Sequence, residues 1–304
     1  MKATGKQAIS KKLLTILKKR YKEKGPVPKY EGPILETILY AICLENASSK
    51  QADVVLARLE DEFHDWNEVR VSSISELAVV FDDLVDPETR ALRVRSALQY
   101  VFEKNFEFEF EALRRKTLDL ARKQLLRIKE LSPFVRTFTL QAALGSHLIP
   151  TDDQMRGVAI WLGFAKPGVN ATRVSESLKS SVRKSDAPLF CHLLRCLACD
   201  PLVAKVFQSE KLGSGDGFEL STAPARLEQL FKDAARKKTA RKAAAKAKKP
   251  KTKSARSKTA AKPKTTPKKA TRRKPAATKT KKKSATKRKK PAAKKKTAKR
   301  ATRR

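Results

Sequence analysis

The chain has 304 residues and a formal net charge of +39. No apolar run reaches the roughly 18 residues that a membrane-spanning helix needs, so no such helix is expected. The apolar residues 13–17 are too few for a secretory signal and are followed by lysines, so we expect an intracellular protein, cytoplasmic or nucleoid-associated in a bacterium and nuclear in a eukaryote. Four unevenly spaced cysteines in such a protein predict reduced thiols rather than a disulfide framework.

Positive charge is concentrated at the C-terminal end. Residues 234–304 contain 34 of the 70 lysines and arginines and neither Asp nor Glu, whereas the other basic residues nearly balance the 31 acidic ones. A segment of Lys, Arg, Ala, Pro, Thr and Ser without aromatic residues cannot bury enough apolar surface to offset chain entropy, so residues 233–304 are predicted to be disordered. Because self-repulsion of this size is unfavourable without a counterpart, binding to a polyanion is favoured over a role in solubility alone.

Nucleic acid is the polyanion that this tail fits best. The tail has no apolar face or aromatic side chain that would insert into a membrane. Lysine and arginine neutralise phosphates of any sequence, with a steep dependence on salt, so we expect double-stranded DNA as the partner, with RNA left open by charge alone. The tail residues expected to bind DNA are Lys237, Lys238, Arg241, Lys242, Lys248, Lys249, Arg272, Arg273, Lys281, Lys282 and Lys283.

The rest of the chain reads as a series of helices, beginning with a basic amphipathic helix over residues 9–21 that Gly25-Pro26 follows. Ser48 or Ser49 can cap the helix over residues 50–63. Ser72 or Ser73 can cap the helix that runs through Phe81, and Glu76 is placed for a capping box if Ser73 is the cap. Residues 106–110 read FEFEF and alternate like a strand, but an extended connector is favoured because no other segment offers a strand partner. Further helices are predicted over residues 34–44, 50–63, 73–81, 88–102, 113–128, 174–182, 186–207 and 224–232. The fold class is therefore all-α.

Residues 125–163 form the segment around which the others are arranged. They contain two apolar runs separated at Ser132-Pro133, and then Thr151-Asp152-Asp153 at the start of a third. This pattern predicts two helices joined by a tight hairpin, followed by a loop that brings an acidic pair to the start of a new helix.

The order of these features resembles the helix-hairpin-helix DNA glycosylase superfamily, of the endonuclease III type. Residues 38–59 (ILYAICLENASSKQADVVLARL) are similar to that family's buried helix, its following turn and its next helix, and residues 129–163 to its hairpin and catalytic loop. The resemblance places Asn46 where the family has a Gln that fills the gap left by an extruded base. It implies a two-lobed helical fold and a role in base-excision repair, and the tail is similar to linker-histone tails.

The hairpin departs from the family's pattern. Family members read Leu-Pro-Gly-Val-Gly where this chain has residues 131–135, LSPFV. The glycines let backbone amides approach a phosphate, and Pro133 has no amide hydrogen to donate, so phosphate binding here would depend on Arg136 and the helix start. Thr137 stands where lyase members have the lysine that forms a Schiff base, which makes lyase activity improbable.

Asp152 stands at the position of the family's catalytic aspartate, ten residues before Leu162. The resemblance implies that it would stabilise the developing cationic sugar and help to activate water after base flipping. Thr151-Asp152-Asp153 is also ordinary helix-capping chemistry, and the two interpretations stay open.

Other candidate sites are weaker. Cys191, Cys196 and Cys199 lie near the family's iron–sulfur loop, but only three cysteines are present where four are needed, so no cofactor and no metal are expected. Trp66 and Trp161 are interpreted as packing residues. Five glutamates could suggest a pair of catalytic carboxylates, but nothing in the sequence brings them together, so we interpret them as facing solvent. They are Glu36, Glu45, Glu107, Glu109 and Glu111.

The sequence thus predicts three parts: a basic N-terminal helix and linker (1–30), a helical domain (31–232) and a DNA-binding tail (233–304). The leading hypothesis is a monomeric, monofunctional DNA N-glycosylase that uses Asp152 and water. The alternative is a catalytically inactive nucleoid- or chromatin-associated protein that binds DNA through the same fold and tail.

Overall fold

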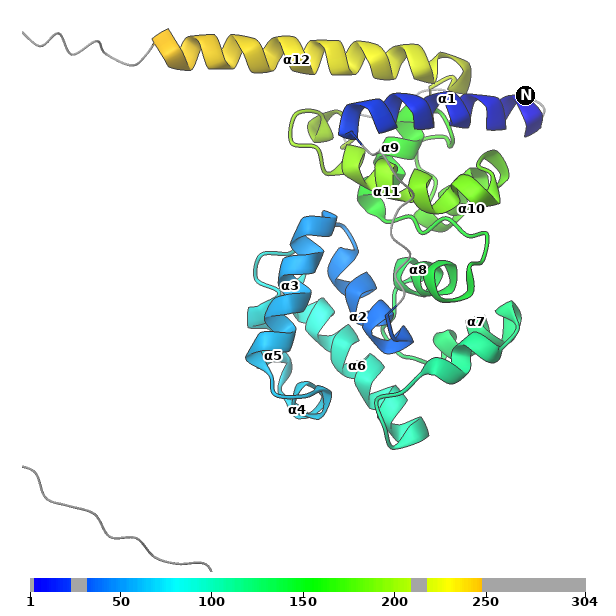
Figure 1. Cartoon of the computed structure of the whole chain (residues 1–304), viewed down its shortest axis with the longest axis vertical. Helices are drawn as coiled ribbons and strands as arrows, with labels where there is room; N and C mark the ends of the chain where they lie inside the picture. The colour runs from blue at the N-terminus through cyan, green and yellow to red at the C-terminus, as the bar shows by residue number, and fades with distance from the viewer. Residues whose placement is uncertain (1–2, 23–31, 209–217, 248–304) are drawn as a thin grey trace, which may run out of the picture. The chain divides into compact units, whose positions relative to one another are not determined.

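The computed structural model describes residues 3–22, 32–208 and 218–247. All of the described residues belong to one compact unit. Every regular element among them is a helix, which confirms the all-α prediction (Figure 1). None of these helices combines the length and the apolar character needed to cross a membrane.

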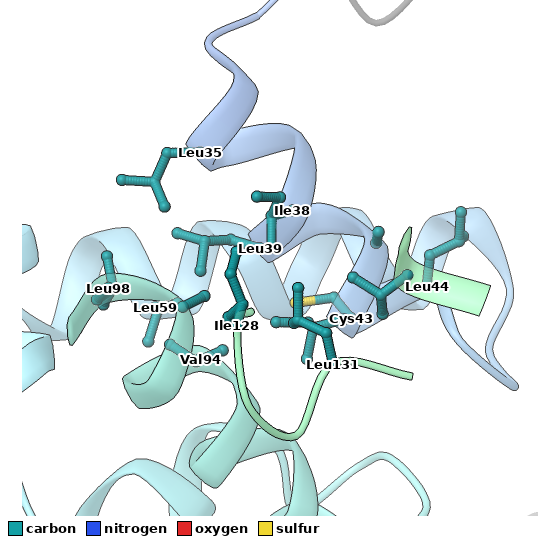
Figure 2. Packing of buried hydrophobic residues seen from close by; sticks show 14 of the residues in the cluster. Leu35, Ile38, Leu39, Cys43, Leu44, Leu59, Val94, Leu98, Ile128 and Leu131 are labelled. Carbon is teal, nitrogen blue, oxygen red and sulfur yellow. The ribbon is translucent and has the colours of Figure 1, made fainter. Parts of the chain in front are cut away.

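The first hydrophobic core is built around helix α2, Ile34–Leu44. This helix is buried along nearly its whole length and packs against α3 (Ser49–Glu62), α6 (Pro87–Asn105) and α8 (Pro133–Leu144). Figure 2 shows Leu39 of α2 in the cluster with Leu59 of α3 and Leu98 of α6. A helix that is apolar on all sides must lie inside the protein, which the sequence predicts for this segment. The other elements of this core are α3 (Ser49–Glu62), α4 (Trp66–Val71), α5 (Ile74–Val80), α6 (Pro87–Asn105), η1 (Glu111–Arg115), α7 (Leu118–Leu126) and α8 (Pro133–Leu144).

A second hydrophobic core combines the N-terminal helix with the later part of the chain. Leu13 and Leu17 of α1 are fully buried in it, together with Phe190 and Leu194 of α11. The N-terminal helix therefore packs against the last helices of the described chain, α11 and α12. The elements of this core are α1 (Ala3–Tyr21), α9 (Asp153–Leu162), α10 (Ala171–Ser181), α11 (Ala187–Ala198), η3 (Ala204–Val206), η5 (Leu220–Thr222) and α12 (Ala223–Ala247). The short helix η2 (Lys184–Asp186) precedes α11 and has no buried residue.

Helix starts agree well with the predicted caps. Ser73 accepts a hydrogen bond from the amide of Glu76, and the Glu76 carboxylate accepts one from the amide of Ser73, so the predicted capping box is present. Ser48 forms a similar box with Gln51 at the start of α3. These local signals act within one turn of helix and are readable in the sequence.

Several predicted boundaries are wrong. The first helix begins at Ala3 rather than at residue 9, and α10 begins at Ala171 rather than at residue 174. The helix predicted over 113–128 is split, because Lys116 is extended and Thr117 caps a new helix, α7. The helix predicted over 186–207 ends at Ala198, just before Asp200-Pro201, where proline disfavours helical backbone in the residue that precedes it. The last helix, predicted to end at residue 232, continues to Ala247. Its alanine- and lysine-rich sequence has high helix propensity, which the compositional interpretation of the tail overlooked.

Candidate functional site

Asp152 lies at the N-terminus of α9, where its side chain caps the helix. Its Oδ1 accepts a hydrogen bond from the amide of Met155 at 2.8 Å, and its Oδ2 accepts one from the amide of Asn46 at 3.0 Å. Oδ2 also pairs with Nη1 of Arg195 at 2.9 Å, and the Asp152 side chain is 0% exposed. Both carboxylate oxygens are thus occupied by protein donors, away from solvent.

Arg195 comes from α11 and joins the two hydrophobic cores. Its Nη1 also donates to the carbonyl oxygens of Leu44, at 2.7 Å, and Ala47, at 3.0 Å, at the C-terminal end of α2. Its guanidinium lies over the ring of Phe134, with 4.9 Å between Cζ and the ring centroid. The Arg195 side chain is only 6% exposed, so its positive charge is stabilised by Asp152 and by these carbonyl dipoles instead of by water.

A second buried arginine holds the same end of α2. Arg90 of α6 donates to the carbonyl oxygens of Ile42 and Glu45, and its Nε donates to Val85 at 2.8 Å. Helix C-termini leave carbonyl groups without helical partners, and cationic side chains there also complement the helix dipole. The turn after α2 is therefore fixed from two sides, by Arg90 and by Arg195.

Asn46 lies in this turn and adopts a left-handed backbone, with φ of 53°. Its side-chain Oδ1 accepts a hydrogen bond from the amide of Gln154 at 3.4 Å, and Nε2 of Gln154 donates to its carbonyl oxygen at 3.0 Å. Asn46 is half-buried. The structure thus brings Asn46 and Asp152 together and binds Asn46 to the start of α9.

The hairpin between α7 and α8 is closed by its own hydrogen bonds. Ser132 caps α8 by accepting from the amide of Val135 at 3.1 Å, and the amide of Arg136 donates to the Ser132 carbonyl oxygen at 3.2 Å. The Arg136 guanidinium donates to the Leu131 carbonyl oxygen, and the Thr137 hydroxyl donates to the Pro133 carbonyl oxygen at 2.7 Å. These groups are engaged within the hairpin in the unbound protein.

Positive charge nevertheless gathers around the hairpin. Burial, and then repulsion from Arg122 and Arg93, lowers the pKa of the Arg136 guanidinium below its ordinary value. Nε of Arg93 donates to the Glu130 carbonyl oxygen at 3.1 Å, and its Nη1 pairs with Glu45. The Glu45 side chain is only 13% exposed, so its assignment to a solvated face is wrong: the ion pair with Arg93 holds it.

A cavity of about 620 Å³ lies beside this site, between α2, α8 and α11. The rings of Tyr40 and Phe138 line it, with 6.1 Å between their centroids, and so does Asp53. Burial, with the nearby charge of Asp53, raises the pKa of Tyr40 to about 12. Pro150 and Met155, on either side of Asp152 in the sequence, also line the cavity, but Asp152 does not.

The cysteines have separate surroundings. Cys43 and Cys191 are buried, and burial raises the pKa of each thiol to about 12. Sγ of Cys196 lies 3.6 Å from Nε2 of His192, whereas the Cys199 thiol donates to Oε1 of Gln154 at 3.4 Å. Within the described ranges no group of three His, Cys, Asp or Glu side chains is placed to hold a metal ion.

The remaining candidates differ in where they lie. Trp161 lies in the second core, where its ring centroid is 5.3 Å from that of Phe207, and this agrees with the predicted packing role. Lys237 and Lys238 are exposed on α12, and Arg241 and Lys242 belong to the same helix. The other predicted tail contacts lie outside the described residues: Lys248, Lys249, Arg272, Arg273, Lys281, Lys282 and Lys283. The arginines Arg90 and Arg195, which dominate the site, were not predicted, because their burial arises only from long-range packing.

Comparison with known proteins gives structural matches alone. No protein-family model and no curated protein matches the chain. Among solved structures, a trapped covalent endonuclease III–DNA intermediate aligns with a TM-score of 0.48 and 15% identity, covering 62% of this chain and 84% of the other. A non-covalent endonuclease III–DNA complex aligns with a TM-score of 0.49 and 15% identity, again covering 62% of this chain and 84% of the other. A thermostable thymine-DNA glycosylase aligns with 0.46 and 14%, covering 64% of this chain and 88% of the other.

Proposed function

We propose that this chain is a DNA-binding protein whose glycosylase-like helical domain is tethered to DNA by its basic tail, and in which Asp152 has a structural role rather than a catalytic one. The observation that carries the proposal is the carboxylate itself. It has no exposed surface, caps α9 and is paired with Arg195.

A catalytic carboxylate must reach the reacting atoms. To stabilise a cationic sugar or to orient water, an oxygen of Asp152 would have to approach the substrate within about 3 Å. Here the oxygens accept from Met155, Asn46 and Arg195 instead. Freeing one of them would leave the buried Arg195 charge short of its counter-ion, which is strongly unfavourable. Thr137, at the position of the family's lysine, supplies no alternative nucleophile of that kind.

Charge supports the DNA-binding part of the proposal. Burial, and after it the charges of Arg122 and Arg93, lowers the pKa of Arg136, and a phosphate bound at the hairpin would favour the charged form of this side chain. The tail adds positive charge without any carboxylate. Such binding is expected to be independent of sequence and steeply dependent on salt.

A second candidate function is monofunctional DNA N-glycosylase activity. The cavity beside Asp152 favours it, because its aromatic rings and its volume of about 620 Å³ suit a planar ligand. This function requires Asp152 to exchange Arg195 for substrate when DNA binds.

Damaged DNA separates the two functions. The full chain, its Asp152→Asn variant and an Asp153→Asn control are incubated with duplexes that carry a panel of damaged bases, and alkali then reveals abasic sites. Asn keeps the helix cap, and the Asp153 side chain is 74% exposed, which makes it a matched control. We expect binding without strand breaks above background for all three proteins. Breaks that depend on Asp152 would overturn the structural role and establish the glycosylase.

The tether is tested separately. A chain that ends at Ala247 retains every helix that the structure describes. We expect it to bind an undamaged duplex more weakly and with a smaller dependence on salt. An unchanged salt slope would contradict the role of the tail.

A further inference from the structure

Helix α1 presents a basic face to solvent. Leu13 and Leu17, both 0% exposed, anchor its opposite side in the second core. Side chains spaced three, four and seven residues apart lie on one side of a helix. The exposed side chains from the middle of α1 to just past its end follow this spacing: Lys11, Lys12, Thr15, Lys18, Lys19 and Lys22. We refer to these six residues as the lysine face.

Within the part of the chain that the structure describes, no carboxylate forms an ion pair with the lysine face. Helix α1 contains neither Asp nor Glu. Arg20 is the contrasting case, since it pairs with Asp200 at 3.2 Å and lies over the ring of Phe231 at 5.1 Å. Among the described residues, the five lysines of the face have no ion pair of this kind. Their charge is therefore available to a partner.

Helix α12 extends this basic surface towards the tail. Its first half packs against α1, with 6.4 Å between the ring centroids of Tyr21 and Phe231. In Figure 1 α12 lies beside α1 and continues beyond its end. Arg236, Lys237 and Lys238 are exposed residues of α12. The packing of α1 thus places the lysine face next to the helix from which the tail begins.

We propose that the lysine face is an ordered docking surface for the phosphate backbone of duplex DNA, distinct from the hairpin and from the tail. The proposal rests on the proposed function and adds a contact surface to it. From residue 11 to residue 22 a helix advances about 16 Å. Over that length a duplex carries roughly ten phosphates on its two strands, so five lysines can engage one side of it. Thr15 is the sole other member of the face, which therefore offers no apolar side chain to a membrane.

Lysine footprinting tests the contact on the full chain. The protein is acylated with an amine-reactive reagent, with and without an undamaged mixed-sequence duplex, and each lysine is quantified by mass spectrometry. We expect Lys11, Lys18 and Lys19 to be protected several-fold by DNA. The exposed lysines Lys104 and Lys166, outside this face, serve as internal controls and should label equally in both samples.

Matched variants then measure the contribution to binding. Replacing Lys11, Lys18 and Lys19 by Gln is compared with replacing Lys104, Lys166 and Lys184 by Gln, which removes the same charge from exposed positions elsewhere. The slope of log affinity against log salt should fall by about one for each phosphate that a lysine no longer neutralises, so by about three in the face variant and by almost nothing in the control. Circular dichroism and Tm should be unchanged in both.

The outcomes separate this proposal from the proposed function. If the wild-type chain does not bind DNA, the proposed function fails and this inference fails with it. If the wild type binds but the lysine face is not protected, or the two variants have equal salt slopes, the docking surface alone is refuted. Loss of binding to vesicles containing phosphatidylserine, with an unchanged DNA slope in the face variant, would assign the face to anionic membranes and also overturn the proposal.

Discussion

Replacing Arg195 by Met removes the side chain that joins the two hydrophobic cores. Met retains much of the aliphatic volume but none of the donors. The substitution leaves the carbonyl groups of Leu44 and Ala47 without Nη1, at 2.7 and 3.0 Å, and leaves Asp152 without its counter-ion at 2.9 Å. Because the Asp152 side chain is 0% exposed, water cannot replace these bonds without local opening.

The expected loss is large compared with the stability of a typical domain. Breaking a buried ion pair by removing one partner costs about 3–5 kcal/mol. Since the net stability of a domain is about 5–15 kcal/mol, Arg195→Met should remove a substantial fraction of it. Asp152→Asn should cost less than Arg195→Met, because Asn still caps α9 and Arg195 keeps two carbonyl partners. The double variant should be destabilised by less than the sum of the two single variants, with a difference of about 1–3 kcal/mol.

Urea unfolding of the full chain measures these free energies. Trp66 packs against the first core and Trp161 lies in the second, so Trp66→Phe and Trp161→Phe backgrounds report on one core each. We expect Arg195→Met to lower both midpoints and to separate the two transitions, because it removes a polar link between the cores.

Arg58→Met is the matched control. Arg58 pairs with Asp82 and Asp83, whose side chains are 66% and 60% exposed, and ion pairs at the surface contribute less than about 1 kcal/mol. A cost of Arg195→Met no greater than that of Arg58→Met would refute the buried clamp. Strict additivity of Arg195→Met and Asp152→Asn would refute the coupling between them.

Other consequences can be measured on the same protein. Gly157→Ala should lower Tm by several degrees, because a Cβ there would fall on the carbonyl oxygen of Phe207; an unchanged Tm would contradict that packing. Ser73→Ala should lower the free energy of unfolding by about 1 kcal/mol, because α5 loses its cap, and Ser73→Asn should keep most of that stability. Cys43 and Cys191, with pKa values raised from 9.0 to about 12, should resist alkylation at neutral pH until the protein unfolds; fast labelling of native protein would contradict their burial. Since the unfolded thiols ionise first, stability should fall between about pH 9 and 12, by roughly 1.4 kcal/mol per thiol for each pH unit, and Cys43→Ala should weaken this slope.

Local features of the fold could be predicted because they depend on a few consecutive residues. The bounds of α2 follow from an apolar run between Pro33 and a polar turn, and the capping box of Ser73 and Glu76 spans one turn of helix. Charge segregation at the C-terminal end is likewise a property of composition. The predicted boundaries that failed lie where two local signals compete, as at Asp200-Pro201, where an apolar periodicity continues past a helix breaker.

An all-helical protein with a hairpin, an aspartate at the start of a helix and a basic tail could be predicted from local patterns, since periodicity, caps and composition are local properties. Tertiary structure alone decided what that aspartate contacts. Arg195 is 43 residues from Asp152 in the chain, and no local pattern indicates that α11 brings its guanidinium to the end of α2 and to the cap of α9. Burial depends on such long-range packing, and burial is what turns a candidate catalytic carboxylate into one half of an interior ion pair.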